Sequence, residues 1–263
     1  MYRRRPIIDK LIYALISSLV AFFLAHSTGA ESPFHAGRLA ESLLFDGRYY
    51  VALLAVALSV SAVAVAFGKL RGVLEHFFEA RIPNIWGRHV TGALLTGLVA
   101  FGAALVLRWE GSFDAVLGER GGPGAVVSLV LGSGEAVIEA ALVGELTATV
   151  ALVALVAKLL ASLTTITSGG SAGLLFPTMF FGTAVAVIWA AVFGYSDPVV
   201  LIAPALTASL VSIVNVPIAA IFIVVELFGA DWLVPSLFML VVVSIVTHEN
   251  SIYRTQHDSF DSS

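Results

Sequence analysis

Residues 168–177 read Ser-Gly-Gly-Ser-Ala-Gly-Leu-Leu-Phe-Pro and separate two apolar runs. No Asp, Glu, Lys or Arg occurs from Leu159 to Ser196, so this glycine-rich break lies inside a charge-free stretch. Non-helical backbone at membrane depth is tolerated only where it is buried in protein or lines a cavity. Pro177 suits the first turn of a helix expected at 174–192, because its missing N–H would have no partner there. The break therefore predicts a helix N-terminus that points into the protein interior.

The break admits two interpretations from its residues alone. A helix N-terminus that points inward would bind an anion through backbone N–H groups, without any basic side chain. A glycine-lined helix crossing would use the same small residues to let two backbones pack closely. Both interpretations stand until more of the chain is considered.

The composition of the 263 residues requires a lipid environment. Apolar residues make up 59% of the chain and charged residues 12%, whereas soluble domains carry about 25% charged residues. The mean hydropathy is +0.97. A soluble fold of this length cannot bury so much apolar surface in one core. We therefore predict an all-α polytopic membrane protein with tilted and broken helices.

The polar residues argue against several classes of function. There is no cysteine, which excludes disulfides and thiolate metal sites, and no histidine pair has metal-ligand spacing. The net charge is −4 and the basic residues are scattered, so no nucleic-acid surface is expected. We find no nucleophile elbow, no H-E-x-x-H and no paired aspartates at membrane depth. We therefore expect no enzyme activity and no cofactor.

The N-terminal end sets the expected orientation. Arg3, Arg4 and Arg5 precede an apolar stretch at 11–25, and the positive-inside bias places this end in the cytoplasm. A secretory signal peptide would show a similar basic start, apolar core and small residues, here 27–30. The later apolar segments argue against a signal peptide, because they leave no soluble domain to be secreted.

Further apolar segments predict about eight or nine helices, several of them shorter than the ~20 residues that a bilayer span needs. The segment 49–79 predicts one long helix with an amphipathic end, because its charges fall at helical spacing. The remaining pieces are 89–107 between Trp86 and Trp109, 125–131, a helical stretch bearing Glu135, Glu139 and Glu145, 146–165, 174–192, 199–214, 217–227 and 232–247. Short, broken apolar segments are typical of transporters with discontinuous helices.

Four motifs resemble elements of the CLC family of chloride channels and proton–chloride antiporters. Residues 173–177, followed by Gly182-Thr183, resemble its G-x-F-x-P…G-T element. Residues 215–227 resemble an apolar helix that this family opens with a proline and closes with a glutamate. Ser251-Ile252-Tyr253 is similar to the tripeptide of its ion-coordinating tyrosine, and 132–135 resemble its glycine turn before a short helix. The similarity covers essentially the whole chain in the family's order.

The resemblance implies the second of two inverted membrane halves. On this basis residues 1–248 form an incomplete CLC-type membrane domain with one preceding helix, and 249–263 form a cytoplasmic tail. The backbone at Gly173, Leu174 and Leu175 would face a chloride ion, and the hydroxyl of Tyr253 would donate a hydrogen bond to it. Neutral dipoles suit this task because they hold an ion without trapping it.

The resemblance also implies partners and a location. The expected ligands are chloride and protons, with the lipid bilayer as solvent. A voltage-gated homodimer in a bacterial cell membrane is expected, with both termini in the cytoplasm. The sequence leaves open whether such a protein is a channel or an antiporter.

Departures from the family pattern concern half of the ion pathway. Leu175 stands where the family often has Phe, and Phe176 stands where a small residue is common. The family's G-S-G-I-P element, whose serine binds the ion, and its G-[KR]-E-G-P element, whose glutamate gates the pore, do not occur. We therefore expect that the chain alone transports nothing, and that it belongs to a longer product or pairs with a separate first half. The alternative is a non-transporting dimerisation or scaffold module.

Two charged residues stand within or at the end of apolar segments. Glu226 ends the short segment 217–227 and is either a proton-relay acid or, as we favour, a helix-end carboxylate near the interface. Lys158 interrupts an apolar span, so it must reach the interface or find a partner.

Overall fold

The computed structural model describes residues 39–109, 130–170 and 173–247, with short pieces between 13 and 29. Packing divides the chain into two units, Met1–His35 and Ala36–Ser263. The described pieces of the first unit are mostly helical, as expected for 11–25. No strand occurs among the described residues of either unit, which agrees with the predicted all-α class.

The second unit is a series of helices of unequal length. In chain order its elements are the 3₁₀-helix η1 (Glu41–Phe45), α2 (Gly47–Arg81), α3 (Ile85–Trp109), α6 (Glu135–Leu142), α7 (Ala148–Thr167), α8 (Leu175–Phe193), α9 (Val199–Ser209), the π-helix η3 (Leu210–Val214), α10 (Pro217–Phe228), the 3₁₀-helix η4 (Ala230–Trp232) and α11 (Leu233–Thr247). Five described helices are long and apolar enough to cross a membrane: α2, α3, α7, α8 and η4 with α11. The others are too short, as the broken apolar pattern predicted.

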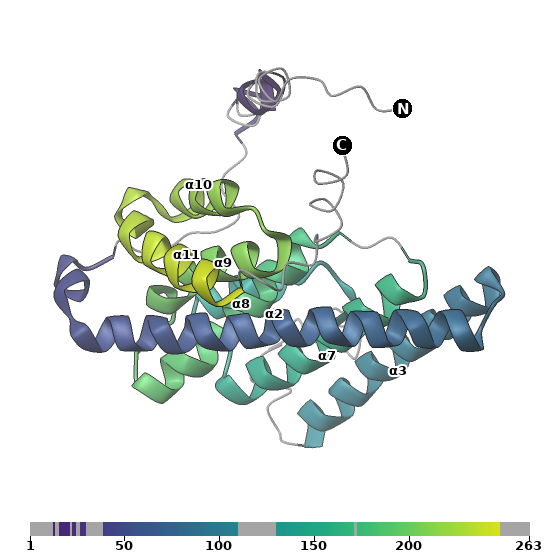
Figure 1. Cartoon of the computed structure of the whole chain (residues 1–263). Helices are drawn as coiled ribbons and strands as arrows, with labels where there is room; N and C mark the ends of the chain where they lie inside the picture. Colours follow the sequence, from purple (N-terminus) through teal and green to yellow (C-terminus); the bar gives the residue numbers. More distant parts are fainter. Residues whose placement is uncertain are drawn as a thin grey trace. The chain divides into compact units, whose positions relative to one another are not determined.

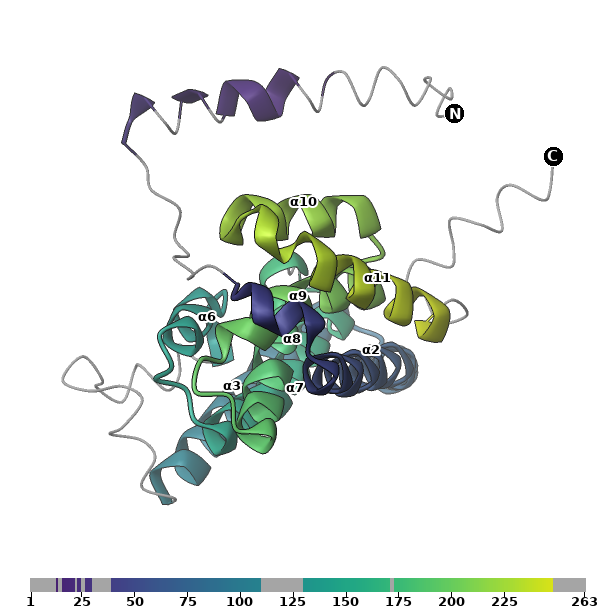
Figure 2. The ribbon, with the colours of Figure 1, turned by 90° about the vertical axis from the view of Figure 1, so that its left-hand side faces the viewer.

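Helices α8 and α9 form the centre of this unit. Every residue of α9 is buried, and α8 packs against α7 on one side and α9 on the other. Figure 2 shows α10 and α11 on one side of this central pair and α3 and α7 on the opposite side. Helix α2 runs across the unit beside α7, α8, α9 and α11 (Figure 1). The buried part of α8, which begins at Thr178, therefore lies within a framework of packed helices.

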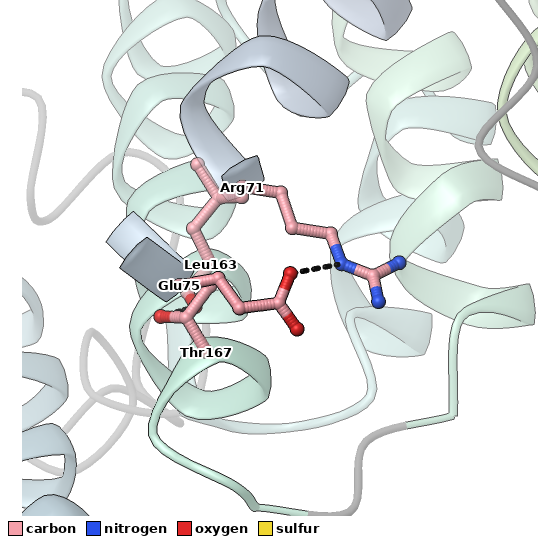
Figure 3. Close-up of polar contacts among 4 residues, drawn as sticks. All are labelled: Arg71, Glu75, Leu163 and Thr167. Atoms are coloured by element: carbon pink, nitrogen blue, oxygen red, sulfur yellow. Dashed lines mark hydrogen bonds and ion pairs between the residues drawn. The ribbon is translucent and has the colours of Figure 1, made fainter. Parts of the chain in front are cut away.

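Helix α2 is one continuous element, as its charge spacing predicted. Its 35 residues correspond to about 52 Å at 1.5 Å per residue, well beyond the ~30 Å of a hydrocarbon core. Asp46 caps its start by accepting a hydrogen bond from the Arg48 backbone N–H at 2.9 Å. Near its end the Arg71 Nε atom lies 3.8 Å from Glu75 Oε2 (Figure 3). This charged end suits the membrane surface.

Helices α8 and α9 cross so closely that the contact needs a glycine. A Cβ atom at Gly182 would lie 2.6 Å from both the Ala205 carbonyl oxygen and Ser209 Oγ. No side chain fits there unless one of the two backbones moves. Gly182 therefore determines how closely α8 packs against α9.

Three predicted boundaries were wrong. Helix α3 begins four residues before His89, because the Asn84 side chain accepts a hydrogen bond from Trp86 N–H at 3.0 Å and so caps an earlier start. Glu145 lies outside α6, since Gly144 adopts a left-handed φ of 77° and its N–H and that of Glu145 bond back to the helix. The segment 199–214 is not one regular helix but α9 followed by the π-helix η3.

Candidate anion-binding site

The N-terminus of α8 carries no side-chain cap. Its N-cap residue is Leu174, and Pro177 is the third residue of the helix, as predicted. Within the described residues the N–H groups of Leu174 and Leu175 donate no hydrogen bond. The first N–H groups of a helix lack intrahelical partners and carry the positive end of its dipole. This end can therefore bind an anion through the backbone.

The backbone at the end of the break opens to free space within the described chain. Gly173 is exposed, and a Cβ atom placed on it would meet no atom within 4 Å. The Leu174 side chain is half-buried, and that of Leu175 is 44% exposed. The structure thus brings three of the four predicted site residues together at one accessible helix end. Tyr253, the fourth, lies outside the described residues.

The beginning of the break serves the other predicted purpose, helix packing. A Cβ atom at Gly170 would lie 2.8 Å from the Thr165 carbonyl oxygen, and one at Gly169 would lie 3.1 Å from the His89 ring. Gly169 also has a left-handed φ of 93°. Gly169 therefore packs closely against α3, as the helix-crossing interpretation predicted, and Gly170 packs against the last turn of α7. Gly173 leaves the helix end open, and the anion-binding interpretation stays a prediction.

A cavity of about 400 Å³, with both polar and apolar residues in its wall, adjoins the end of the break. Four parts of the chain contribute to its wall: Thr96 of α3, residues 130–133, four residues of α7, and Gly173, Phe176 and Pro177 beside the start of α8. The α7 residues are Lys158, Ala161, Ser162 and Thr165. The first turn of α8 thus faces a space that also receives hydroxyl groups and an ammonium group.

Lys158 finds the partner that its place in an apolar span required. Its side chain is 3% exposed, and Nζ donates hydrogen bonds to the carbonyl oxygens of Val130, at 3.0 Å, and Gly132. These carbonyls belong to the turn that precedes α6. Sequence reasoning missed this contact, because 26 residues separate Lys158 from Gly132 and no local pattern connects them.

The glycine turn before α6 is held against α8. Gly134 is the N-cap of α6 with a φ of 94°, and a Cβ atom there would lie 3.0 Å from the Phe180 ring. A glycine turn followed by a short helix is confirmed at this position. Together with Lys158, this contact places the turn beside the start of α8 and forms one wall of the cavity.

The start of α10 also depends on a special backbone conformation. Asn215 adopts a left-handed φ of 59°, the one non-glycine residue with positive φ in the described chain. It ends η3 and is followed by Val216 and the helix-starting Pro217. Glu226 lies in the last turn of α10 and is exposed. Its position at a helix end agrees with the interpretation that we favoured.

One pattern requires a correction. Residues 169–173 read Gly-Gly-Ser-Ala-Gly and do match G-x-S-x-G. A nucleophile elbow of that type joins a strand to a helix. Here the pattern follows the helix α7 and precedes the helix α8. The match therefore has no catalytic context.

Comparison with known proteins identifies the family. The family model described as voltage gated chloride channel matches residues 1–249. The chain belongs to this family. Its CLC membership agrees with the four motifs and with the membrane-spanning helices. No curated protein matches the sequence.

A solved CLC structure has the same fold. The structure described as "Crystal structure of a CLC-type fluoride/proton antiporter" matches with a TM-score of 0.70 at 23% sequence identity. The match covers 94% of this chain and 55% of that chain, so this CLC chain spans about half the length of its structural neighbour. At this identity the likeness establishes the all-helical CLC fold.

Proposed function

We propose that the chain contributes one side of an anion pathway across a membrane, with chloride as the transported ion. The observation that carries this proposal is the uncapped N-terminus of α8, which opens beside a cavity with hydroxyl groups and an ammonium group in its wall. The amides of Leu174 and Leu175 and the backbone at Gly173 bind the ion. The hydroxyl of Tyr253 donates a further hydrogen bond. No net charge is needed, because aligned peptide dipoles stabilise the anion.

The other side of the pathway comes from residues that this sequence lacks. The chain carries neither G-S-G-I-P nor G-[KR]-E-G-P. The amides of α8 therefore need complementary donors from another polypeptide region, covalently joined or separate. Without them, the backbone groups face lipid or unfilled space at a cost of several kcal/mol each. We propose that the chain alone does not transport.

Liposomes that contain the purified chain provide the test. Chloride efflux should stay at the level of protein-free vesicles. It should appear when the chain is assembled with a polypeptide that carries both missing motifs. Efflux of fluoride should be recorded in parallel, since the structural neighbour is named a fluoride/proton antiporter. Robust efflux from the chain alone would contradict the need for a second half.

An antiporter and a channel differ in whether chloride movement is coupled to proton movement. If the complete assembly is an antiporter, a pH gradient should drive chloride uptake against its concentration gradient. A channel would only let chloride equilibrate.

We propose that the protein is a homodimer in a bacterial cell membrane, with both termini on the cytoplasmic side. We also propose that its transport depends on voltage, which planar-bilayer recording of the complete assembly would measure.

A second candidate is a non-transporting dimerisation module. The observation that favours it is the exposed apolar surface of α10, where the Ile218 and Phe222 side chains are 72% and 67% exposed. Such a surface contacts either lipid or a second copy. Cross-linking in membranes, with no efflux from the chain assembled with both missing motifs, would support this candidate.

A further inference from the structure

Lys158 is the one charged side chain that is buried in the described part of the second unit. It lies in the middle of α7, one of the helices long enough to cross a membrane. Moving a charge out of water is costly unless an opposite charge or a set of hydrogen bonds compensates for it. The groups around Lys158 therefore indicate its role.

The two carbonyl partners of Lys158 leave its charge without a counterion. Carbonyl groups of Val130 and Gly132 accept two of the three ammonium protons but carry no net charge. Among the described residues, no carboxylate lies within 4.0 Å of Lys158 Nζ. The ion pair in this part of the chain joins Arg71 and Glu75 instead. One N–H group and one positive charge thus remain available at the wall of the cavity.

Ser162 adds a second free donor one helical turn along α7. Residues four apart lie on the same face of a helix, and both Lys158 and Ser162 line the cavity. The Ser162 residue is 7% exposed, and no hydrogen bond joins its hydroxyl to a described residue. Because this hydroxyl opens to the cavity, it is available to a ligand or to water there.

Two neighbouring hydroxyls, those of Thr165 and Thr96, differ from Ser162 because they already form hydrogen bonds within the chain. Thr165, on the next turn, donates to the Ala161 carbonyl oxygen at 2.8 Å. Thr96 lies 2.7 Å from the Thr164 hydroxyl oxygen.

The Ser133 hydroxyl oxygen accepts from Glu135 N–H at 3.4 Å, which leaves its own proton free. The free side-chain donors of the cavity are therefore Lys158, Ser162 and Ser133. A positive charge beside hydroxyl donors is suited to a small anion.

We propose that this cavity binds a small monovalent inorganic anion, with the Lys158 ammonium as counterion and the Ser162 hydroxyl as hydrogen-bond donor. The space of about 400 Å³ admits a halide with several water molecules, since one water occupies about 30 Å³ in the liquid. This site deepens the proposed function and rests on it for its role in transport, because Gly173 and Pro177 place it beside the α8 amides. It concentrates anions next to the neutral site.

A purely structural role is the alternative for Lys158. In that case the ammonium would only hold the turn at 130–132 against α7, and any group that fills the same space would serve. The two roles differ in one measurable property. An anion site needs a positive charge at this position, whereas a structural contact needs volume and hydrogen bonds.

A single introduced cysteine separates the two roles. The chain contains no cysteine, so Lys158→Cys carries its sole thiol. Aminoethyl methanethiosulfonate adds an ammonium group to that thiol, and methyl methanethiosulfonate adds a neutral group. Isothermal titration of the purified full chain in lipid nanodiscs with sodium chloride and sodium fluoride then measures binding. Mass spectrometry records the extent of modification.

The expected result is loss and charge-specific recovery of binding. Lys158→Cys should weaken anion binding about tenfold to a hundredfold, since hydrogen bonds to charged groups contribute ~1.5–3 kcal/mol. The ammonium adduct should restore most of the affinity, whereas the methyl adduct should not. Ser162→Ala should weaken binding about tenfold for the same reason. If Lys158→Cys does not fold, Ser162→Ala still tests the proposed site.

Thr167→Val provides a matched control on the same helix. The Thr167 hydroxyl is buried and donates to the Leu163 carbonyl oxygen at 2.7 Å, outside the cavity (Figure 3). It should leave anion affinity unchanged. Equal recovery with both adducts, unchanged affinity in Lys158→Cys, or a thiol that does not react with either reagent would each overturn the proposed cavity site.

Tyr253→Phe distinguishes this inference from the proposed function. Binding that needs Lys158 but survives Tyr253→Phe would support the cavity site and count against the proposed tyrosine contact. Binding that needs Tyr253 but survives Lys158→Cys would support the proposed function and overturn the cavity site. A wild-type chain that binds neither chloride nor fluoride would overturn the cavity site.

Discussion

The starts of α7 and α8 differ in how they treat their free N–H groups. At α7 the Thr147 side chain accepts a hydrogen bond from Val150 N–H at 3.4 Å, as in ordinary helix capping. At α8 the corresponding residue is Leu174, whose side chain has no acceptor, and no other side chain takes its place. A cap would satisfy the amides that an anion needs. The contrast shows that the first N–H groups of α8 have no side-chain acceptor, as the predicted anion site requires.

Placing an acid at the start of α8 should have the largest effect on this contrast. Leu174→Asp puts a carboxylate where the anion would bind. Two like charges ~6 Å apart repel by about 3 kcal/mol at an effective dielectric of ~20, so chloride affinity should fall on the order of 100-fold. Titration calorimetry on the complete assembly measures this. Leu174→Asn is the neutral control, and an equal loss in that variant would mean that charge is not the cause.

A disturbed contact between α8 and α9 should have the second-largest effect, a loss of fold stability. Gly182→Ala places a methyl group 2.6 Å from the Ala205 carbonyl oxygen and should destabilise the fold by about 1–3 kcal/mol. Thermal unfolding in detergent, followed by circular dichroism, measures the change. Gly97→Ala on α3 has no atom within 4 Å and should be neutral or stabilising. Similar melting temperatures for the two variants would contradict the close crossing.

Removing the tyrosine hydroxyl should have a smaller effect on the ion. Tyr253→Phe deletes one hydrogen bond to a charged ligand, which contributes about 1.5 kcal/mol or more, so chloride affinity should fall about tenfold. Halide titration of the complete assembly tests this. Tyr50→Phe is a suitable control, since the Tyr50 ring packs against Phe238 in the described fold. Unchanged affinity in Tyr253→Phe would show that only the α8 amides bind the ion.

Removing the cap from α7 should have the smallest effect and should not reach the ion. Thr147→Ala leaves one backbone N–H without a partner and should cost about 1 kcal/mol of stability. Chloride affinity should remain that of the wild-type chain, because this helix end does not face the site. A drop in affinity that matches the drop in stability would mean that the two helix ends are not independent.

Local signals predicted the parts of the site that depend on local chemistry. The glycine-rich break, Pro177 in the first turn of α8 and the glycine turn before α6 all follow from backbone properties of single residues. The length of α2 follows from charge spacing along one helix. The sequence also contains the signal for the earlier start of α3, because Asn84 is a typical N-cap residue. The predicted start at His89 did not use it.

Features that depend on tertiary contacts could not be predicted. The position of Val130 and Gly132 beside Lys158 depends on how α6 packs against α8, which no sequence period encodes. The cavity arises from the same packing. The π-helix η3 lies in a run without charged residues and carries a serine, as α9 does, so nothing in its composition distinguishes it from α9. The role of Tyr253 stays a prediction, since that residue lies outside the described part.

The close contact between α3 and the end of α7 links the break before α8 to the surrounding lipid. A Cβ atom at Gly92 would lie 2.1 Å from Ser168 Oγ, so α3 cannot tilt without displacing the residue that begins the break. Of the described candidate spans, α3 has the smallest buried share, at 22%. Bilayer thickness acts on such a helix through hydrophobic mismatch. We therefore expect halide affinity to vary with acyl-chain length, and titrations in nanodiscs of short-chain and long-chain lipids would measure that dependence.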